Sequence, residues 1–442
     1  MSLKNKIPPY LIIILSFLGV IIIGTILLAL PIATKERVSL GFIDAFFTTV
    51  TSVCVTGLTT ISNFGETFSL FGKFVIAILI EIGGLSFLTL TVFFLVVFKI
   101  KLGISESFLM REQLNQGSLK DLEKLIVKIV KMTLIIQGIA SVIFTFVFYF
   151  SKELDFSFGQ SIGVAIFHSI SSFNNAGIDI LGRSDSLAIY HNNYLVNILT
   201  MILIVLGGIG FSVLIDTWNN KKWKKLRLHT KITWLTTLIL IVGGSILIKC
   251  SMWNGLTLLE ALFLSVTSRT CGFSTFDLSQ MSNACYCIVI ILMFIGASSC
   301  SAGGGVKTST VFVVINFIYN YARGKTNNAF YRRISNKVLL KALALINFAL
   351  IWNVLLTLII CAIEPESVSF KDILFEEVSA FSTAGLQICD AAKFSSATKL
   401  LLCLSMFLGR IGPLTFMGMM NKHWLSETDE KVKFVEENIM IG

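Results

Sequence analysis

Four segments of the chain share one pattern. They read AFFTTVTSVCVTGLT (45–59), AIFHSISSFNNAGID (165–179), ALFLSVTSRTCGFST (261–275) and ILFEEVSAFSTAGLQ (373–387). In each, a phenylalanine precedes a glycine, by ten residues in three copies and by nine in the third. Internal repetition of this kind is a guide to the whole architecture. A single copy would be interpreted as an external turn, but four matched copies indicate a repeated structural unit.

Long apolar blocks flank each of these segments. The chain of 442 residues is 55% hydrophobic and only 14% charged, whereas soluble domains carry about 25% charged residues. Crossing a bilayer takes roughly 20 apolar residues. The blocks are Tyr10–Leu30, Phe71–Phe98, Ile126–Phe150, Tyr194–Ile215, Ile232–Ile248, Ile288–Phe294 with its continuation, Leu339–Ile363 and Leu400–Met420. The sequence therefore predicts an all-α polytopic membrane protein with eight spanning helices. The first block exceeds the roughly 7–15 residues of a signal core, so we expect a retained helix.

A second motif follows each segment in its downstream block. It reads EIGGLS from Glu81, LGGIGF from Leu206, AGGGVK from Ala302 and LGRIGP from Leu408. The repeated unit is thus a helix, a short re-entrant segment and a second helix. We expect the units at 8–98, 124–215, 231–321 and 337–420, followed by a tail at 421–442. Non-helical backbone at membrane depth must be shielded by protein or line a watery cavity, so the four segments predict one pore with pseudo-fourfold symmetry.

The positive charge is concentrated in a few loops. The net charge is +10, and the stretches 99–131, 216–231 and 322–341 hold more than half of the 36 lysines and arginines. Short basic loops stay in the cytoplasm. We therefore place both termini in the cytoplasm, and the re-entrant segments enter from outside. Because topology accounts for the charge, no nucleic-acid partner is predicted.

The chemistry of cation binding explains why each segment contains a glycine. A dehydrated cation needs a cage of oxygens, which a ring of backbone carbonyls supplies. Aiming successive carbonyls at one axis requires backbone conformations that only glycine adopts readily. The helix before each glycine would direct its partially negative C-terminal end at the pore. Asp44, Glu260 and Asp372 lie near the starts of three of these helices, and the second copy lacks an equivalent.

The chain resembles the Trk/Ktr/HKT superfamily of potassium transporters over about residues 10–442. The resemblance rests on Val55-Thr-Gly-Leu, Asn175-Ala-Gly-Ile, Arg269-Thr-Cys-Gly-Phe, Ser382-Thr-Ala-Gly-Leu and the stretch Phe294-Ile-Gly-Ala-Ser-Ser-Cys-Ser-Ala-Gly-Gly-Gly-Val-Lys-Thr. Trk-type relatives usually carry extra N-terminal helices. The first unit here begins near residue 8, so the chain is most similar to the bacterial Ktr pore subunits.

The resemblance implies a potassium filter in a bacterial plasma membrane. Its ion-binding residues would be Val55, Thr56, Gly57, Asn175, Ala176, Gly177, Thr270, Cys271, Gly272, Thr383, Ala384 and Gly385. Related plant transporters with serine at the first glycine favour sodium, so Gly57 favours K⁺ as the transported ion. Sodium is a candidate activator, and no cofactor is expected in this chain. No copy keeps Gly-Tyr-Gly, which implies a shorter filter than that of a tetrameric channel.

Two further features suggest a gate. Gly303, Gly304 and Gly305 precede Lys307, and three glycines in a row cannot form a stable helix because each costs about 1 kcal/mol relative to alanine. The residues alone leave a packing kink open, whereas the resemblance implies an intramembrane loop below the filter. Arg410 lies near the middle of the last block, where a charge usually faces a cavity or a partner. The resemblance places it beneath the filter, bonded to loop carbonyls, with Glu81 as a candidate counter-charge.

The resemblance also implies partners. The chain has neither a GxGxxG after a strand nor a P-loop, and in the Ktr family a cytoplasmic nucleotide-binding RCK-type subunit controls a homodimer of pore subunits. The loops 216–231 and 322–341 would form the docking surface, and the tail 421–442 would make the dimer contact. The residues alone leave open that these loops only determine topology.

Two other classes of function fit the sequence less well. A repeat-type secondary transporter of a different substrate would need broken helices in both of its paired halves, and the sequence shows one glycine-rich break. A membrane enzyme would need a nucleophile, a base or a metal group, and the four histidines and nine cysteines form no such constellation. We therefore expect an ion-conducting protein that is not an enzyme.

Overall fold

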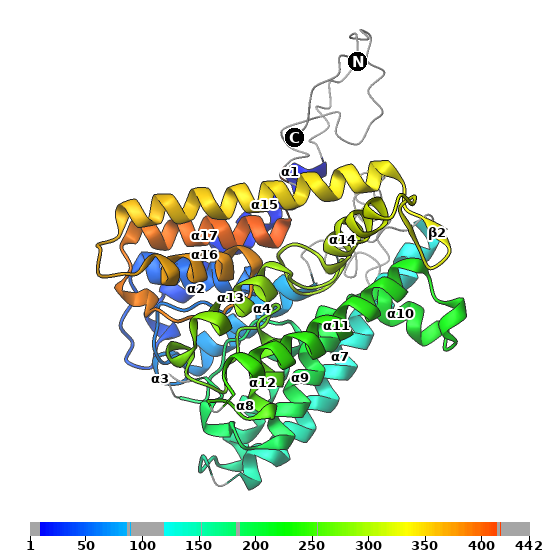
Figure 1. Ribbon diagram of the computed structural model, residues 1–442. Coiled ribbons are helices and arrows are strands. Elements are labelled where there is room, and N and C mark those ends of the chain that lie inside the picture. The colour runs from blue at the N-terminus through cyan, green and yellow to red at the C-terminus, as the bar shows by residue number, and fades with distance from the viewer. Residues whose placement is uncertain are drawn as a thin grey trace, which may run out of the picture.

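The computed structural model describes residues 9–85, 89, 119–151, 153–182, 186–253, 255–412 and 416. The end of the first predicted unit, most of the basic loop 99–131 and the tail 421–442 therefore lie outside the described residues. Four groups of helices follow one another along the chain (Figure 1). They are α1 (Pro9–Ala29), α2 (Phe42–Cys54), α3 (Phe64–Thr67) and α4 (Leu70–Leu85); α7 (Leu119–Phe150), α8 (Phe158–Phe173), α9 (Tyr194–Gly208) and α10 (Phe211–Asn219); α11 (Leu228–Ser251), α12 (Leu258–Thr267), α13 (Asn283–Phe294) and α14 (Thr308–Ala322); and α15 (Asn336–Ile363), α16 (Phe370–Ser382) and α17 (Ser396–Ile411).

Short elements join these helices. Single 3₁₀ turns lie at Pro31–Ala33, Ala188–Tyr190, Trp223–Lys225, Leu278–Gln280 and Ala391–Lys393. A two-stranded antiparallel hairpin, β1 (Asn328–Ala329) with β2 (Arg332–Arg333), lies inside the basic loop 322–341. It lies at the same end of the molecule as α10 and α14 (Figure 1).

The first and second helices of the units differ in length. Within the described residues, α11, α15 and Lys124–Phe150 of α7 are long and apolar enough to cross a membrane, and α9 with α10 makes a fourth span if the bent pair is counted as one. The shorter helices α1, α4, α13 and α17 occupy the other predicted positions. A helix thus stands at each of the eight expected places, and eight full spans remain a prediction.

Burial separates the outer helices from the re-entrant ones. The outer faces of α1 and α15 expose Ile22, Ile26, Ile351 and Leu358, each by more than half of its surface. In contrast, every residue of α2 from Phe47 to Cys54 is buried. Contiguous exposed apolar surface marks an interaction site such as a membrane. The helix α2 is shielded behind such outer helices, whereas α8 still exposes part of Ile162 and Ile166.

The starts of the re-entrant helices follow local capping rules. Asp44, Glu260 and Asp372 each lie in the first turn of their helix, as predicted. In α8 the same end is closed by a capping box between Ser157 and Gln160, so hydrogen bonds satisfy the first amide groups without an acidic residue.

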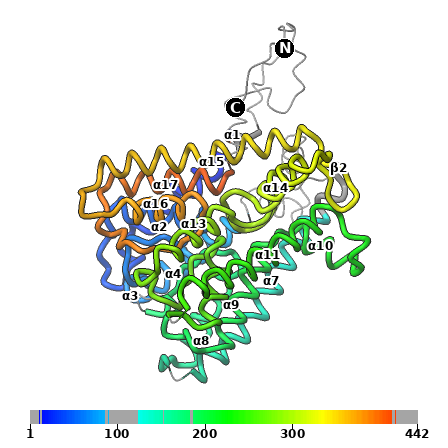
Figure 2. The backbone as a smooth tube through the Cα atoms, viewed as in Figure 1, coloured from blue at the N-terminus to red at the C-terminus, as the bar shows by residue number. Residues whose placement is uncertain are grey.

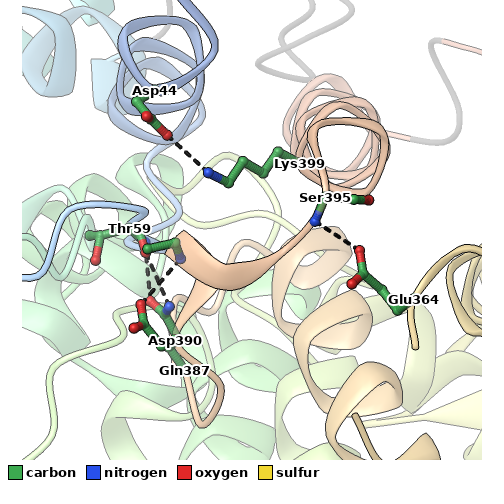
Figure 3. Close-up of polar contacts among 8 residues, drawn as sticks. Asp44, Thr59, Glu364, Gln387, Asp390, Ser395 and Lys399 are labelled. Atoms are coloured by element: carbon green, nitrogen blue, oxygen red, sulfur yellow. Dashed lines mark hydrogen bonds and ion pairs between the residues drawn. The ribbon is translucent and has the colours of Figure 1, made fainter. Parts of the chain in front are cut away.

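The units contact one another in cyclic order. The second helix of each unit packs on the re-entrant helix of the next, in the pairs α4 with α8, α9 with α12, α13 with α16, and α17 with α2. Two polar contacts accompany this packing. Lys399 pairs with Asp44 at 3.1 Å across the first and last units (Figure 3), and the Tyr286 hydroxyl donates to Asp372 at 2.5 Å.

Glycines permit the close approach of the second helix to the re-entrant helix in the first, second and fourth units. A Cβ on Gly83, Gly207 or Gly409 would overlap the backbone carbonyl of Val53, Phe173 or Phe381, respectively, at the end of the re-entrant helix. Hydrogen is therefore the only side chain that this contact tolerates.

Two second helices are broken in the part of the chain that the structure describes. The break between α13 and α14 was predicted, and the backbone leaves the helical path there (Figure 2). The expectation that only the third unit is interrupted was wrong, because α9 and α10 are bent by 96°. At this second break Gly210 adopts φ +98°, a left-handed conformation that glycine accepts without steric cost.

The glycine packing can be tested by thermal unfolding in detergent. Gly207→Ala should destabilise the protein by about 1–3 kcal/mol or more, because overpacking forces the backbone apart. The control is Gly243→Ala in α11, where no heavy atom of the described residues lies within 4 Å of the added Cβ. Alanine there should raise stability by up to about 1 kcal/mol. Equal melting temperatures for the two variants would contradict the packing argument.

Candidate functional site

The four repeated segments adopt matching backbone conformations. Gly57, Gly177, Gly272 and Gly385 have φ values of +103°, +63°, +93° and +76°, which confirms the conformation predicted from the sequence. Two residues earlier, Val55, Asn175 and Thr383 are also left-handed. Such φ values are unusual for β-branched residues and concentrate at functional sites. The third segment, one residue shorter, has no equivalent left-handed residue.

Hydrogen bonds behind the segments repeat in the same way. The amide of the residue before each glycine donates to a carbonyl of the re-entrant helix, in the pairs Thr56 to Thr51, Ala176 to Ser171, Cys271 to Thr267 and Ala384 to Ser379, all within 2.8–2.9 Å. The hydroxyls of Ser171, Thr267 and Ser379 each donate at 2.7 Å to the carbonyl of the residue after the glycine. In the first segment Thr51 instead accepts from the Gly57 amide at 3.0 Å.

The segments meet in a closed ring. A Cβ on Gly57 would stand 2.6 Å from the Ala176 oxygen. Equivalent contacts join Gly177 to the Cys271 oxygen, Gly272 to the Ala384 oxygen at 2.9 Å, and Gly385 to the Thr56 oxygen. The carbonyl preceding each glycine therefore faces the glycine of a neighbouring unit. The structure brings together all twelve predicted filter residues, and Asn175 and Thr270 add a side-chain contact of 2.8 Å between the second and third segments.

A cavity of about 760 Å³ lies against this ring. All four glycines line it, together with Asp179, Asp277 and Asp390. Hydrogen bonds from Ser279, and then from Gln280, lower the pKa of Asp277 below its ordinary value. A cavity lined by carboxylates concentrates cations, so its charge suits positively charged ions.

The glycine-rich loop 296–305 lies against the other side of the ring. The Gly304 amide donates to the Thr383 hydroxyl at 2.8 Å, and a Cβ on Gly303 would stand 2.6 Å from the Thr270 side chain. The Lys307 ammonium donates to the carbonyl of Gly303 at 2.7 Å and to that of Gly304 at 3.3 Å. The loop therefore contacts predicted filter residues of both the third and the fourth units.

Arg410 lies where several units converge. Its guanidinium donates to the carbonyl of Ala302 in the loop and to those of Gly83 and Gly84 at the end of α4. The predicted bond to a loop carbonyl is confirmed. The suggestion that Glu81 is its counter-charge was wrong, because carbonyls satisfy the guanidinium. The Glu81 carboxylate instead accepts from Gln137 at 2.9 Å and from Asn174 at 2.6 Å.

The break between α9 and α10 holds the same loop. The amides of Ser298 and Ala302 donate to the carbonyls of Gly208 and Gly207 at 3.0 and 3.2 Å, and the Phe211 amide donates to Cys300 at 3.0 Å. Helix ends leave such groups unsatisfied, so the broken helix and the loop satisfy each other. Sequence reasoning missed this role of Gly210, although the shared motif aligns it with Gly412.

These two glycines provide a matched test of the loop contact. Gly210 and Gly412 have similar φ values, +98° and +90°, so alanine introduces comparable backbone strain at both. Only at Gly210 would the Cβ meet the loop, 2.5 Å from the Ser299 oxygen, whereas no described atom lies within 4 Å at Gly412. Gly210→Ala should accelerate hydrogen–deuterium exchange of the Ser298 and Ala302 amides by about ten-fold or more, the effect of roughly 1.4 kcal/mol on local opening. Gly412→Ala should leave the exchange rate of these two amides unchanged. Equal acceleration in both variants would contradict the contact between Gly210 and the loop.

Known proteins resemble this chain over nearly its whole length. Potassium/sodium uptake protein NtpJ of Enterococcus hirae is 35% identical, covering 99% of this chain and 98% of that protein. Ktr system potassium uptake protein B is 34% identical in Vibrio alginolyticus and 36% identical in Bacillus subtilis, covering 98% and 93% of this chain and 94% and 92% of those proteins.

The fold has a solved counterpart. The crystal structure of the potassium transporter TrkH from Vibrio parahaemolyticus superposes with a TM-score of 0.71 at 16% identity, covering 96% of this chain and 88% of that one. This likeness concerns the fold. Residues 6–424 also match the TrkH family, whose description is cation transport protein. Because that match spans most of the chain and the relatives exceed 30% identity over full length, the chain belongs to the TrkH family of cation transport proteins.

Proposed function

We propose that this chain is the ion-conducting subunit of a potassium uptake system. The observation that carries the proposal is the ring in which the carbonyl before each glycine faces the glycine of a neighbouring unit. Carbonyl rings of this kind replace the hydration shell of a dehydrated cation. The relatives named for potassium uptake support the choice of ion, and the word sodium in the name of NtpJ supports sodium as an activator.

The path of the ion follows from the charges along it. Cations concentrate in the aspartate-lined cavity and enter a pore of pseudo-fourfold symmetry. The C-terminal ends of α2, α8, α12 and α16 adjoin the filter and carry partial negative charge. Below the filter the loop 296–305, with Lys307 and Arg410, acts as the gate. Fixed positive charge there raises the barrier to a passing cation.

Opening the gate requires an external source of free energy. A ligand shifts an equilibrium only by its differential affinity for the two states, and we assign this role to a cytoplasmic nucleotide-binding RCK-type subunit. Asp216 of α10 accepts from the Arg227 amide at 3.0 Å and from the Thr230 hydroxyl at 2.6 Å. The loop 216–231 is thereby tied to α10, whose first residue bonds the gate loop. A partner bound to this loop would act on the gate through α10.

The assembly follows from the same proposal. Two copies form a homodimer in a bacterial plasma membrane, with both termini in the cytoplasm. The exposed lysines at positions 221, 222, 224 and 225 lie next to α10, and together with the loop 322–341 they offer docking sites to an acidic surface.

A repeat-type secondary transporter is the second candidate. The break between α9 and α10 favours it, because two broken helices in different halves are what such transporters use. The two breaks here, however, bond directly to each other through backbone groups. Uptake that follows the membrane potential and the K⁺ gradient alone would exclude this alternative.

The filter assignment is tested by Gly57→Ser in proteoliposomes. The added Cβ meets the Ala176 oxygen, so the ratio of K⁺ to Na⁺ flux should fall by about ten-fold, equivalent to about 1.4 kcal/mol. The parent should restore growth at low potassium to a bacterium that lacks its own uptake systems. Gly163→Ser is the control, because its Cβ position is open among the described residues. An unchanged flux ratio in Gly57→Ser would remove this glycine from the filter.

The docking surface is tested by charge reversal. Exchanging four exposed lysines for glutamate should abolish co-purification of the regulatory subunit and leave the pore dimer intact, because the contact is electrostatic. The four are Lys221, Lys222, Lys224 and Lys225. A control reverses four exposed basic residues on the predicted outer side, namely Lys35, Arg37, Lys371 and Lys393. Binding that survives the first exchange would exclude the loop 216–231, and a monomeric parent in mild detergent would exclude the homodimer.

A further inference from the structure

A buried carboxylate holds the fourth filter segment from behind. Gln387, Ile388 and Cys389 follow Gly385 and form part of the cavity wall. One oxygen of Glu376 accepts from the amides of Ile388 and Cys389 at 2.7 and 2.9 Å. Glu376 is in the middle of α16 and is only 1% exposed, so it acts on the wall from the protein interior.

No other unit has this arrangement. The equivalent positions, one residue after the repeated phenylalanine, are Thr48, His168 and Leu264. In the described part of the chain, the Thr48 hydroxyl makes no hydrogen bond, and His168 contacts Thr200 and Ser172. Leu264 has no polar group. Only the fourth segment is therefore held by a side chain at this position.

The segment held by Glu376 also joins the first and last units. The Gln387 amide accepts from the Thr59 amide and donates to the Thr59 carbonyl, both at 3.1 Å (Figure 3). It further donates to the Cys389 carbonyl at 2.8 Å. These two units lie at opposite ends of the chain, so their filter segments are held together by non-covalent contacts. We call this junction between the first and last units the seam. Because Gln387 bonds to Cys389, holding the backbone of Cys389 in place also holds the link to Thr59 across the seam.

The arrangement carries an energetic penalty. The second oxygen of Glu376 is buried without a hydrogen-bond partner among the described groups. The nearby Asp372 carboxylate accepts a hydrogen bond from the Tyr286 hydroxyl instead. A buried acceptor without a partner is destabilising, and in a native structure it calls for an explanation. The two hydrogen bonds that Glu376 accepts from the cavity wall provide this explanation.

We propose that Glu376 is a positioning residue of the filter. By holding the backbone at Ile388 and Cys389, it sets the spacing of the ring at the seam between the fourth and first units, and with it the discrimination of K⁺ from Na⁺. The inference rests on the proposed function and assigns a specificity role to a residue outside the filter itself.

The test compares two substitutions at this position in proteoliposomes. Glu376→Ala removes the acceptor and should lower the ratio of K⁺ to Na⁺ flux by roughly ten-fold, because two hydrogen bonds are lost. Glu376→Gln keeps an acceptor oxygen of the same reach and should retain the parent ratio to within about two-fold. Gln387→Ala leaves Glu376 in place but removes the link to Thr59 and the bond to the Cys389 carbonyl. It should reproduce the loss, which keeps the test informative if Glu376→Ala fails to fold.

The neighbouring Glu377 is the matched control. It is also fully buried on α16, but its carboxylate contacts Ser405 of α17 instead of the cavity wall. Glu377→Ala should lower the melting temperature without changing the flux ratio. An unchanged ratio in Glu376→Ala, an equal loss in Glu377→Ala, or an equal loss in Glu376→Gln would each overturn the positioning role.

A binding measurement separates this inference from the proposed function. K⁺ should raise the melting temperature of the parent more than Na⁺ does, because a bound ion stabilises the folded state. Glu376→Ala should lose this difference and Glu377→Ala should keep it. A parent that binds K⁺ selectively but transports none would refute the proposed function alone, whereas selective stabilisation retained in Glu376→Ala would refute the role of Glu376 alone.

Discussion

The contact between each filter glycine and a carbonyl of the neighbouring unit constrains the rest of the structure. Carbonyl oxygens can converge on one axis only if no side chain stands between adjacent segments, so Gly57 and its three counterparts must lack a Cβ. The segments must also stay non-helical at membrane depth, where unsatisfied backbone groups are costly. The surrounding structure meets that demand with buried hydroxyls, such as Ser171 and Ser379, that bond the carbonyls behind the ring. The apolar outer helices then shield this polar centre from lipid.

The same requirement explains the region below the ring. The loop 296–305 is itself non-helical, and its amides and carbonyls pair with the ends of α9 and α10. Each break thus provides hydrogen-bond partners for backbone groups that the other break leaves unpaired. Arg410 completes the arrangement by donating to carbonyls of two different units. A loop held by many modest contacts, and not by one strong bond, is suited to two alternative positions.

The four units are similar in backbone and different in side chains. The residue after the repeated phenylalanine is threonine, histidine, leucine or glutamate, and only Glu376 reaches the cavity wall. The seam between the first and last units also carries the ion pair of Asp44 and Lys399 (Figure 3). This pair is partly exposed, so it contributes no more than about 1 kcal/mol. Hydrogen bonds therefore hold this seam more than the charge pair does.

The sequence by itself determined the repeated unit, the four glycines, their positive φ values and the glycine-rich break after Phe294, because each depends on local chemistry: apolar length, chain stiffness and the absence of a Cβ. It also placed Arg410 against a loop carbonyl, through the resemblance to a known family. It did not reveal the bend at Gly210, the true partners of Glu81 or the contacts of Glu376 with Ile388 and Cys389. These depend on which groups lie opposite one another after packing: Gly210 bends because Cys300 and Ser298 meet its neighbours, and Glu81 faces Gln137 and Asn174, which are distant in sequence. Local conformational preferences depend on neighbouring residues and can be predicted from the sequence. Hydrogen-bond partners from distant segments are decided only by tertiary packing, which must bring their atoms to about 3 Å from each other.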